Sequence, residues 1–305
     1  MARFFKSLCM AAALALIAST PSRATSAVVV SSKLSSESAM IGEMIRLVLE
    51  AAGIPTVNRL RIGATPVVRR ALLDGEVDLY VEYTGNGAIF FDMPSNPAWK
   101  DLRQGYELGA RLDYRRNHIV WLTPAPASNA WALAVRRDVA DAYHLRTMSD
   151  FARWVSGGGH VVLACSAEFA NAGTLAALER TYGFKLSSDQ LIVLAGGETE
   201  AMIAAAAART DGTNTAMVYG TDGGIAAANL VVLEDDRHEQ PIYAPVPLIR
   251  AAVLRAHPRI AALVRPLMES LDRPTLQRLN ERVQVDGESI QEVARDYLQQ
   301  KGLLK

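Results

Sequence analysis

Short apolar strands alternate with amphipathic helices in the first hundred residues, and few folds are compatible with this order. Segments rich in valine, leucine and isoleucine predict strands at residues 28–30, 57–62 and 77–81. Apolar residues at helical spacing between them predict helices, one starting at Ser35 or Ser36 and one with Thr65 as its N-cap. This β-α-β-α-β order is typical of a parallel sheet with crossover helices, which places the protein in the α/β class.

A second α/β unit begins after a proline-containing segment. Thr123-Pro124-Ala125-Pro126-Ala127 predicts a stiff, extended connector, and strands and helices then alternate again as far as Tyr219. Residues 241–247 hold three more prolines and predict a second crossing, which is followed by a helical tail over residues 257–303. We therefore expect two α/β lobes joined by two hinge crossings, with a ligand between them.

The two crossings also predict the domain boundaries. We expect residues 28–127 and 235–305 to form the first lobe and residues 128–234 to form the second. Residues 1–27 precede both lobes and have a different composition from either.

Residues 1–27 have the features of an export signal. Arg3 and Lys6 are followed by an apolar run from Leu8 to Ile17 and then by small residues. The run is too short for a comfortable membrane span, so a retained membrane anchor is the less favoured alternative. We expect cleavage near Ala27 or Val28 and a mature protein in the periplasm.

Charge and motif content narrow the class of function. Lys plus Arg and Asp plus Glu are equal at 32 each, which argues against a nucleic-acid surface and favours a small molecule or a protein as partner. The sequence has no nucleophile elbow, phosphate loop, paired metal-ligand histidines or Cys-x-x-Cys motif. We expect no enzyme activity, cofactor or metal; the alternative is an enzyme that uses Cys165 or His160, without a supporting triad.

A strand that ends in a polar, glycine-rich loop is the first candidate for a binding site. The strand runs into Tyr83-Thr84-Gly85-Asn86-Gly87, and open α/β sheets bind ligands in the crevice beyond their strand ends. The two glycines predict backbone shapes that other residues resist. Lys33 lies in a similar position after the first strand, in a serine-rich loop before a helix N-terminus that suits an anion.

Several motifs together resemble one family, the substrate-binding proteins of osmoprotectant ABC transporters that take glycine betaine, choline or proline betaine. The resemblance covers the mature chain and rests on Gly63-x-Thr65-Pro66-Val67-Val68, on the stretch from Gly75 to Gly85, and on Tyr219-Gly220-Thr221-Asp222-Gly223. Residues 82–88, 121–127 and 241–245 look most like the OsmF (YehZ) branch. The resemblance implies a bilobal periplasmic binding protein of type II.

The expected ligand chemistry explains why aromatic residues matter. A trimethylammonium group has no N–H to donate, so it is held by the negative faces of aromatic rings, each worth roughly 0.5–2 kcal/mol when desolvated. The resemblance assigns such rings to Tyr83 in the first lobe, to Trp131 and Tyr219 in the second, and to Tyr243 beyond the second crossing.

The resemblance also implies polar contacts. Asn129 falls near a family position that contacts the ammonium head, and Lys33, Asn86 and the backbone at Thr84-Gly85 match the region that receives a carboxylate.

One departure from the family pattern bears on specificity. Many relatives carry an arginine shortly after a Glu-Phe pair in the second lobe, whereas Glu168-Phe169 is followed here by Ala170-Asn171-Ala172-Gly173. The absence of this arginine removes a charge-assisted hydrogen bond to a ligand carboxylate, worth roughly 1.5–3 kcal/mol. A weak betaine site, a choline-like ligand without a carboxylate, or another quaternary amine all remain open.

The resemblance thus implies the substrate-binding protein of an ABC importer. It is expected to close on a quaternary ammonium osmoprotectant, as a monomer, and to present the closed form to permease subunits with their ATPase. The alternative is a receptor of the same fold for a different cationic or zwitterionic solute.

Overall fold

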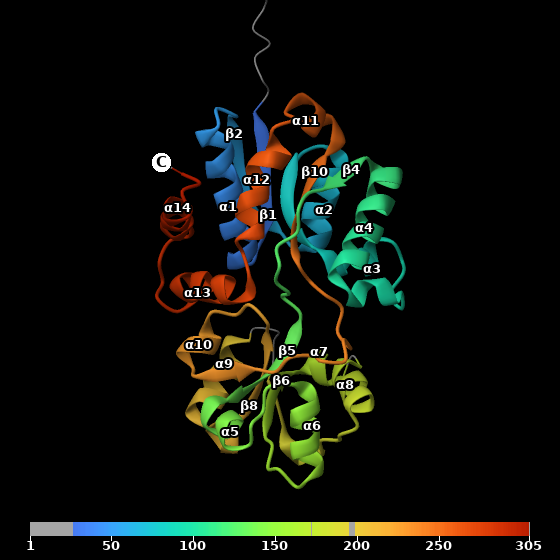
Figure 1. The fold of residues 1–305 in the computed structure, drawn as a ribbon, viewed down its shortest axis with the longest axis vertical. Helices are drawn as coiled ribbons and strands as arrows, with labels where there is room; N and C mark the ends of the chain where they lie inside the picture. Colours follow the sequence, from blue (N-terminus) through green and yellow to red (C-terminus); the bar gives the residue numbers. More distant parts are fainter. Residues whose placement is uncertain (1–26, 172, 195–198, 305) are drawn as a thin grey trace, which may run out of the picture.

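The computed structural model describes residues 27–171, 173–194 and 199–304. The expected export signal lies outside these residues, apart from its last position. The described chain forms two lobes stacked along the long axis, joined by extended segments (Figure 1). The expectation of a bilobal α/β fold is confirmed.

The first lobe is built on a five-stranded sheet. Its strands, in spatial order, are β2 (Thr56–Gly63), β1 (Val28–Lys33), β3 (Leu79–Tyr83), β10 (Pro245–Arg250) and β4 (Ile119–Trp121). β1 pairs in parallel with β2 and β3, but β10 is antiparallel to both β3 and β4. The sheet is therefore mixed rather than parallel, because β10 enters it from the other lobe.

The second lobe repeats this plan. Its strands, in spatial order, are β7 (Leu191–Leu194), β6 (Leu163–Ser166), β8 (Thr215–Tyr219), β5 (Trp131–Arg136) and β9 (Leu230–Val232). β6 is parallel to β7 and β8, and β5 is antiparallel to β8 and β9. In each lobe the antiparallel strand is the one that arrives from a crossing.

Helices cover the faces of both sheets (Figure 1). Those of the first lobe are α1 (Ser36–Ala51), α2 (Thr65–Asp74), α3 (Gly87–Phe90), α4 (Leu102–Asn117), α11 (Ala251–Ala256), α12 (Ile260–Glu269), α13 (Arg273–Gln284) and α14 (Ile290–Gln300). Those of the second are α5 (Arg137–Ala142), α6 (Met148–Ser156), α7 (Ala167–Asn171), α8 (Thr174–Tyr182), α9 (Glu200–Ala208) and α10 (Gly224–Ala227). The α2 helix begins one residue off the prediction, since Ala64 rather than Thr65 is its N-cap.

The two crossings run side by side. Backbone N–H groups of Leu122 and Ala125 donate to the carbonyl oxygens of Pro247 and Pro245, at 2.9 and 2.8 Å. Pro245 and Pro247 therefore belong to β10 rather than to the predicted crossing. Asn129 N donates to Tyr243 O at 2.9 Å, which continues the pairing toward the second lobe. The lobes are thus connected by a hydrogen-bonded pair of segments.

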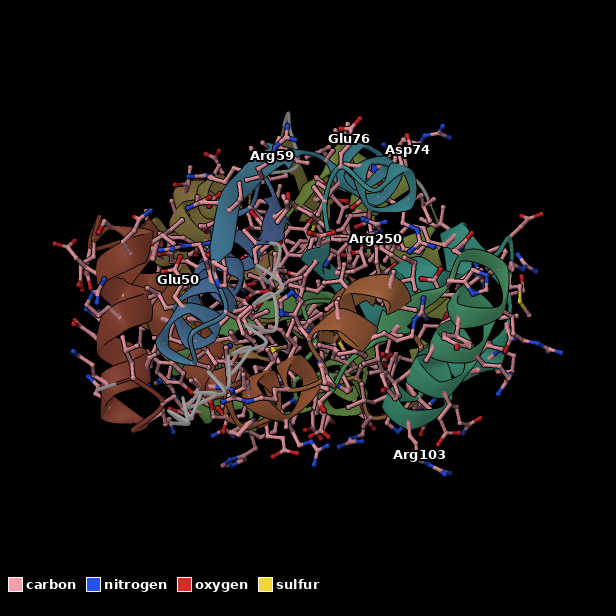
Figure 2. The ribbon with its side chains drawn as sticks, turned by 90° about the horizontal axis from the view of Figure 1, so that it is seen from above. Glu50, Arg59, Asp74, Glu76, Arg103 and Arg250 are labelled. Carbon is pink, nitrogen blue, oxygen red and sulfur yellow. The ribbon has the colours of Figure 1, made fainter. Side chains whose placement is uncertain are left out.

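The end of the first lobe farthest from the second lobe carries charges of both signs. The labelled residues of Figure 2, seen from above, include Glu50, Asp74, Glu76 and Arg250 at this end, while Arg59 lies within β2 and Arg103 at the start of α4. Arg250 pairs with Asp78 at 3.0 Å. Within the described part of the chain, no helix is long and apolar enough to cross a membrane.

Candidate functional site

A cleft of about 1000 Å³ lies between the two lobes. Residues from both lobes and from the second crossing line it, among them Lys33, Glu37, Tyr83, Asn86, Asn129, Trp131, Tyr219, Asp222, Tyr243 and Asn280. Residues far apart in the sequence therefore meet in one solvent-accessible space.

Two of the rings in the cleft form a pair on the second lobe. Trp131 begins β5 and Tyr219 ends β8, and the two residues are register partners in this antiparallel pair. Their ring centroids lie 6.4 Å apart at 36°. Phe169 packs edge-on against the Trp131 ring at 5.9 Å, so the indole is supported from its own lobe. Both rings reach the cleft because they stand at the strand ends nearest the other lobe.

Tyr83 lies on the opposite wall, at the end of β3. Its hydroxyl donates to Glu37 Oε1 at 2.7 Å. Burial raises the pKa of Tyr83 well above its usual value, and the neighbouring Glu37 carboxylate adds to this shift. The phenol therefore remains a neutral donor, and Lys33 Nζ lies 4.6 Å from the centroid of its ring.

The Lys33 charge is balanced by a buried carboxylate. Lys33 Nζ forms an ion pair with Glu82 Oε1, which also accepts hydrogen bonds from Asn86 Nδ2 and from Tyr83 N at 2.7 Å each. Tyr80 donates to Glu82 Oε2 at 2.9 Å. Glu82 is fully buried, and a buried charge is stable only when it is paired and hydrogen-bonded. Lys33 and Asn86 thus line the cleft while already engaged with Glu82.

Tyr243 is held over the loop that follows β3. A Cβ atom built on Gly85 would lie 2.8 Å from the Tyr243 ring, and one on Gly87 would lie 2.5 Å from Trp99. Neither glycine has a positive φ, so the prediction of unusual backbone shapes is wrong. The glycines provide room for the two rings instead.

Thr84 is the one predicted site residue that does not line the cleft. Its hydroxyl donates to Ile242 O at 2.7 Å and accepts from Ala244 N at 3.1 Å. Thr84 therefore fastens the second crossing to the end of β3. The other predicted site residues meet in the cleft: Lys33, Tyr83, Asn86, Asn129, Trp131, Tyr219 and Tyr243.

Glu37 connects several of these residues and was missed by the sequence analysis as a site residue. It is buried in the first turn of α1. Besides Tyr83, Asn129 Nδ2 donates to Oε1 at 2.8 Å, and Asn280 Nδ2 donates to Oε2 at 2.7 Å. An acidic residue in a first helical turn is ordinary, so only the three-dimensional contacts distinguish Glu37.

Helix α13 of the first lobe reaches across to the second. Asn280 Nδ2 also donates to Thr221 O at 2.7 Å, and Gln277 Nε2 donates to Gly220 O at 2.9 Å. Gly223 N donates to Gln284 Oε1 at 2.9 Å. The turn after β8 is thus held by side-chain amides of α13, on one side of the cleft.

Cys165 and His160 do not form a catalytic pair in the cleft. Cys165 is fully buried within the core of the second lobe, and burial raises the pKa of its thiol to about 11, so it stays protonated. Neither residue lines the cleft. Among the residues described, no group of three or more His, Cys, Asp or Glu could hold a metal ion.

The sequence matches a known protein family over most of its length. Residues 26–300 match the family described as the substrate binding domain of ABC-type glycine betaine transport systems. The chain is 50% identical over 300 residues to the glycine betaine-binding protein YehZ of Escherichia coli K12, covering 98% of this chain and 97% of that protein. It is 28% identical over 312 residues to a glycine-betaine-binding protein of Pseudomonas aeruginosa, covering 100% of this chain and 96% of that protein.

Solved structures agree with these relatives. The structure of apo YehZ from Escherichia coli matches with a TM-score of 0.86 at 50% identity, covering 91% of this chain and 99% of that one. A glycine betaine/carnitine/choline ABC transporter structure matches in fold, with a TM-score of 0.79 at 24% identity, covering 91% and 100%.

Proposed function

The chain belongs to the family of substrate-binding domains of ABC-type glycine betaine transport systems, and on this premise we propose that it captures a quaternary ammonium solute, such as glycine betaine or choline, between its lobes. The observation that carries this proposal is the set of four rings, Trp131, Tyr219, Tyr83 and Tyr243, that line one cleft. Rings hold an onium group without needing a donor on the ligand.

The rings come from both sides of the cleft. Trp131 begins β5 and Tyr219 ends β8 in the second lobe, whereas Tyr83 ends β3 in the first. A ligand that contacts both walls binds the closed arrangement of the lobes better than an open one and shifts the population toward it. Burial also raises the pKa of the Tyr243 phenol, so this ring stays neutral beside a cation.

Delivery to a membrane permease completes the proposed role. A substrate-binding domain of this family serves an ABC transporter, and we assign to this chain a permease with its ATPase as partners. Export to the periplasm and a monomeric state belong to the same proposal. The export signal expected in residues 1–27 supports the location.

A second candidate is a different cationic or zwitterionic solute, and within it the engagement of Lys33 favours a cation that has no carboxylate. Because Lys33 pairs with Glu82 and no arginine follows Glu168-Phe169, a betaine carboxylate meets no free charge at either predicted position. A ligand that has no carboxylate needs no such charge, so its affinity is not reduced by the pairing of Lys33 or by the missing arginine.

Calorimetric titration of the mature protein with glycine betaine, choline and proline betaine tests the proposal. We expect at least one of them to bind, and we expect Trp131→Ala to lower its affinity by about tenfold, near the upper end of the ring contribution. Tyr143→Ala is the matched control, because this ring is 58% exposed on the same lobe and does not line the cleft. Absence of binding for all three solutes at millimolar concentration, with an intact fold, would exclude the quaternary ammonium assignment.

A further inference from the structure

Asp222 is a carboxylate that lines the cleft, and the proposed binding of a ligand by the four rings gives it no role. It follows β8 at the end of a tight turn, in which Asp222 N donates to Tyr219 O at 3.0 Å. The side chain lines the cleft with only 9% of its residue surface exposed. It lies three positions after Tyr219, on the same turn that α13 holds.

The two carboxylate oxygens of Asp222 have different surroundings. Oδ2 accepts hydrogen bonds from Thr199 Oγ1 at 2.7 Å and from Tyr219 N at 2.8 Å. Oδ1 has no hydrogen-bond partner among the residues that the structure describes. The Oδ2 atom therefore fixes the side chain in place at the wall of the cleft.

We propose that Asp222 is a charge-selecting residue of this cleft: its carboxylate attracts the cationic group held by the rings of Trp131 and Tyr219, and uptake of a proton by Asp222 weakens that binding. This inference rests on the proposed function and adds a residue and a proton linkage to it.

The charged groups around Asp222 do not neutralise it. Glu200 at the start of α9 and Glu37 in the first turn of α1 both act on it with the same sign of charge. The turn's other neighbour, α13, contributes the amides of Asn280 and Gln284. A cation that enters the cleft is thus the natural partner for this carboxylate.

The remaining charged residues of the cleft do not balance the charge of Asp222. Lys33 is paired with Glu82, and Arg61 is an exposed residue whose Nε donates to Leu34 O at 3.1 Å. Glu168 also lines the cleft but is not among the groups that act most strongly on Asp222.

The ionisation of Asp222 supports a linkage in the neutral range. Burial raises the pKa of its carboxyl to about 7, against the hydrogen bonds from Thr199 and Tyr219. A bound cation favours the ionised form, so binding at or below this pH releases a proton. Affinity for a permanent cation should therefore rise with pH through this range and level off above it.

Choline is the probe that tests this directly, because its charge does not change with pH. We expect titration calorimetry to show an affinity that rises by at least about threefold between pH 6 and pH 8 in the wild type. Asp222→Asn should bind choline more weakly at pH 8 and with the same affinity at both pH values. At pH 6.5, the choline-binding enthalpy of the wild type should differ between two buffers of different ionisation enthalpy, because binding releases a proton that the buffer takes up. The binding enthalpy of Asp222→Asn should be the same in both buffers.

Two further variants separate the proposal from a structural role of Asp222. Glu200→Gln removes a like charge beside Asp222 and should move the midpoint of the pH dependence to lower pH. Glu168→Gln removes a carboxylate from elsewhere in the cleft and should leave the midpoint unchanged. If Asp222 only held the turn and its ionisation did not act on the ligand, Glu200→Gln would shift no midpoint.

The outcomes distinguish this inference from the function on which it rests. Choline binding with no pH dependence in the wild type, or with the same dependence in Asp222→Asn, overturns the role of Asp222 and leaves the proposed function standing. If no onium solute binds at any pH while thermal unfolding shows a folded protein, both fail.

Discussion

Trp131 and Tyr219 are register partners across β5 and β8, with ring centroids 6.4 Å apart. The pairing places both rings at strand ends that face the first lobe. Because adjacent antiparallel strands fix the spacing of opposite residues, the second lobe presents a preformed aromatic wall before any ligand arrives.

The first prediction concerns the ring of Tyr219 rather than its hydroxyl. Tyr219→Phe keeps the aromatic face and should change the affinity for the onium ligand by less than about threefold, whereas Tyr219→Ala should lower it by roughly two- to thirtyfold. Titration calorimetry measures both. Equal losses for the two variants would show that the hydroxyl, not the ring, carries the contact.

Gly85 provides a test of the position of Tyr243. Gly85→Ala would put a Cβ atom 2.8 Å from the Tyr243 ring, so the ring must move and affinity should fall by about as much as in Tyr243→Ala. The double variant should bind no more weakly than Tyr243→Ala alone, because both changes act through one ring. Additive losses in calorimetry would contradict this.

Glu37 is predicted to hold the cleft together. Its carboxylate oxygens accept hydrogen bonds from Tyr83, Asn129 and Asn280. Glu37→Gln replaces one of these two oxygens by an NH2 group, which donates. One buried N–H or O–H group then lacks an acceptor, at a cost of about 1–3 kcal/mol in the free energy of unfolding. Denaturant unfolding measures this.

Glu50→Gln is the control for that change. Glu50 lies on the same helix, but its ion pair with Arg46 is on the surface, where such pairs contribute about 0–1 kcal/mol. If the two variants unfold alike, the hydrogen bonds of Glu37 do not stabilise the fold as proposed.

Asp222 should also make stability depend on pH, in a direction opposite to most carboxylates. Its folded pKa of about 7 lies above its ordinary value of 3.8, so the folded chain binds the proton more tightly than the unfolded chain. The contribution of this group to stability is greatest below the ordinary value and is lost as pH rises through about 7.

Asp222→Asn isolates this contribution. Without ligand, the variant should be more stable than the wild type at pH 8, by at most a few kcal/mol since each pKa unit corresponds to about 1.4 kcal/mol. The difference should shrink toward pH 4. Thermal unfolding at both pH values measures it, and a difference independent of pH would assign another cause.

Local sequence patterns predicted the alternation of strands and helices and the two crossings, but they did not predict β10, whose first residues were assigned to the second crossing. Strand and helix periodicities depend on neighbouring residues, and the prolines of residues 123–127 mark the first crossing directly. Sheet direction was not predictable in the same way. β10 pairs with β3 in antiparallel register although more than 160 residues separate Tyr83 from Pro245, and no local pattern records such a pairing.

The candidate site shows the same difference between what local motifs predict and what only the folded chain reveals. The rings were predicted from motifs, whereas the residues that hold them in place were not. Glu37 meets Asn129 and Asn280 at sequence separations of 92 and 243, so its role appears only in the folded chain. Gly85 shows a further limit, since the sequence alone does not tell whether a glycine serves backbone shape or close packing.

The contact between Gly223 and α13 gives the last prediction. A Cβ atom on Gly223 would lie 2.1 Å from Glu281 N, too close for any side chain, so Gly223→Ala must push the turn and the helix apart. The hydrogen bonds from Asn280 to Thr221 O and from Gly223 N to Gln284 would lengthen or break. We expect a loss of about 2 kcal/mol or more in the free energy of unfolding and weaker ligand binding.

Gly224→Ala is the matched control one residue away. Its added Cβ would lie 3.4 Å from Ile203, an ordinary contact, and alanine is the better helix former in α10. Thermal unfolding and calorimetry should therefore leave Gly224→Ala close to the wild type while Gly223→Ala loses both stability and affinity. If Gly223→Ala lost stability but bound ligand normally, the contact of α13 with the turn would support the fold without shaping the cleft, and the position of Asn280 beside Glu37 would matter only for folding.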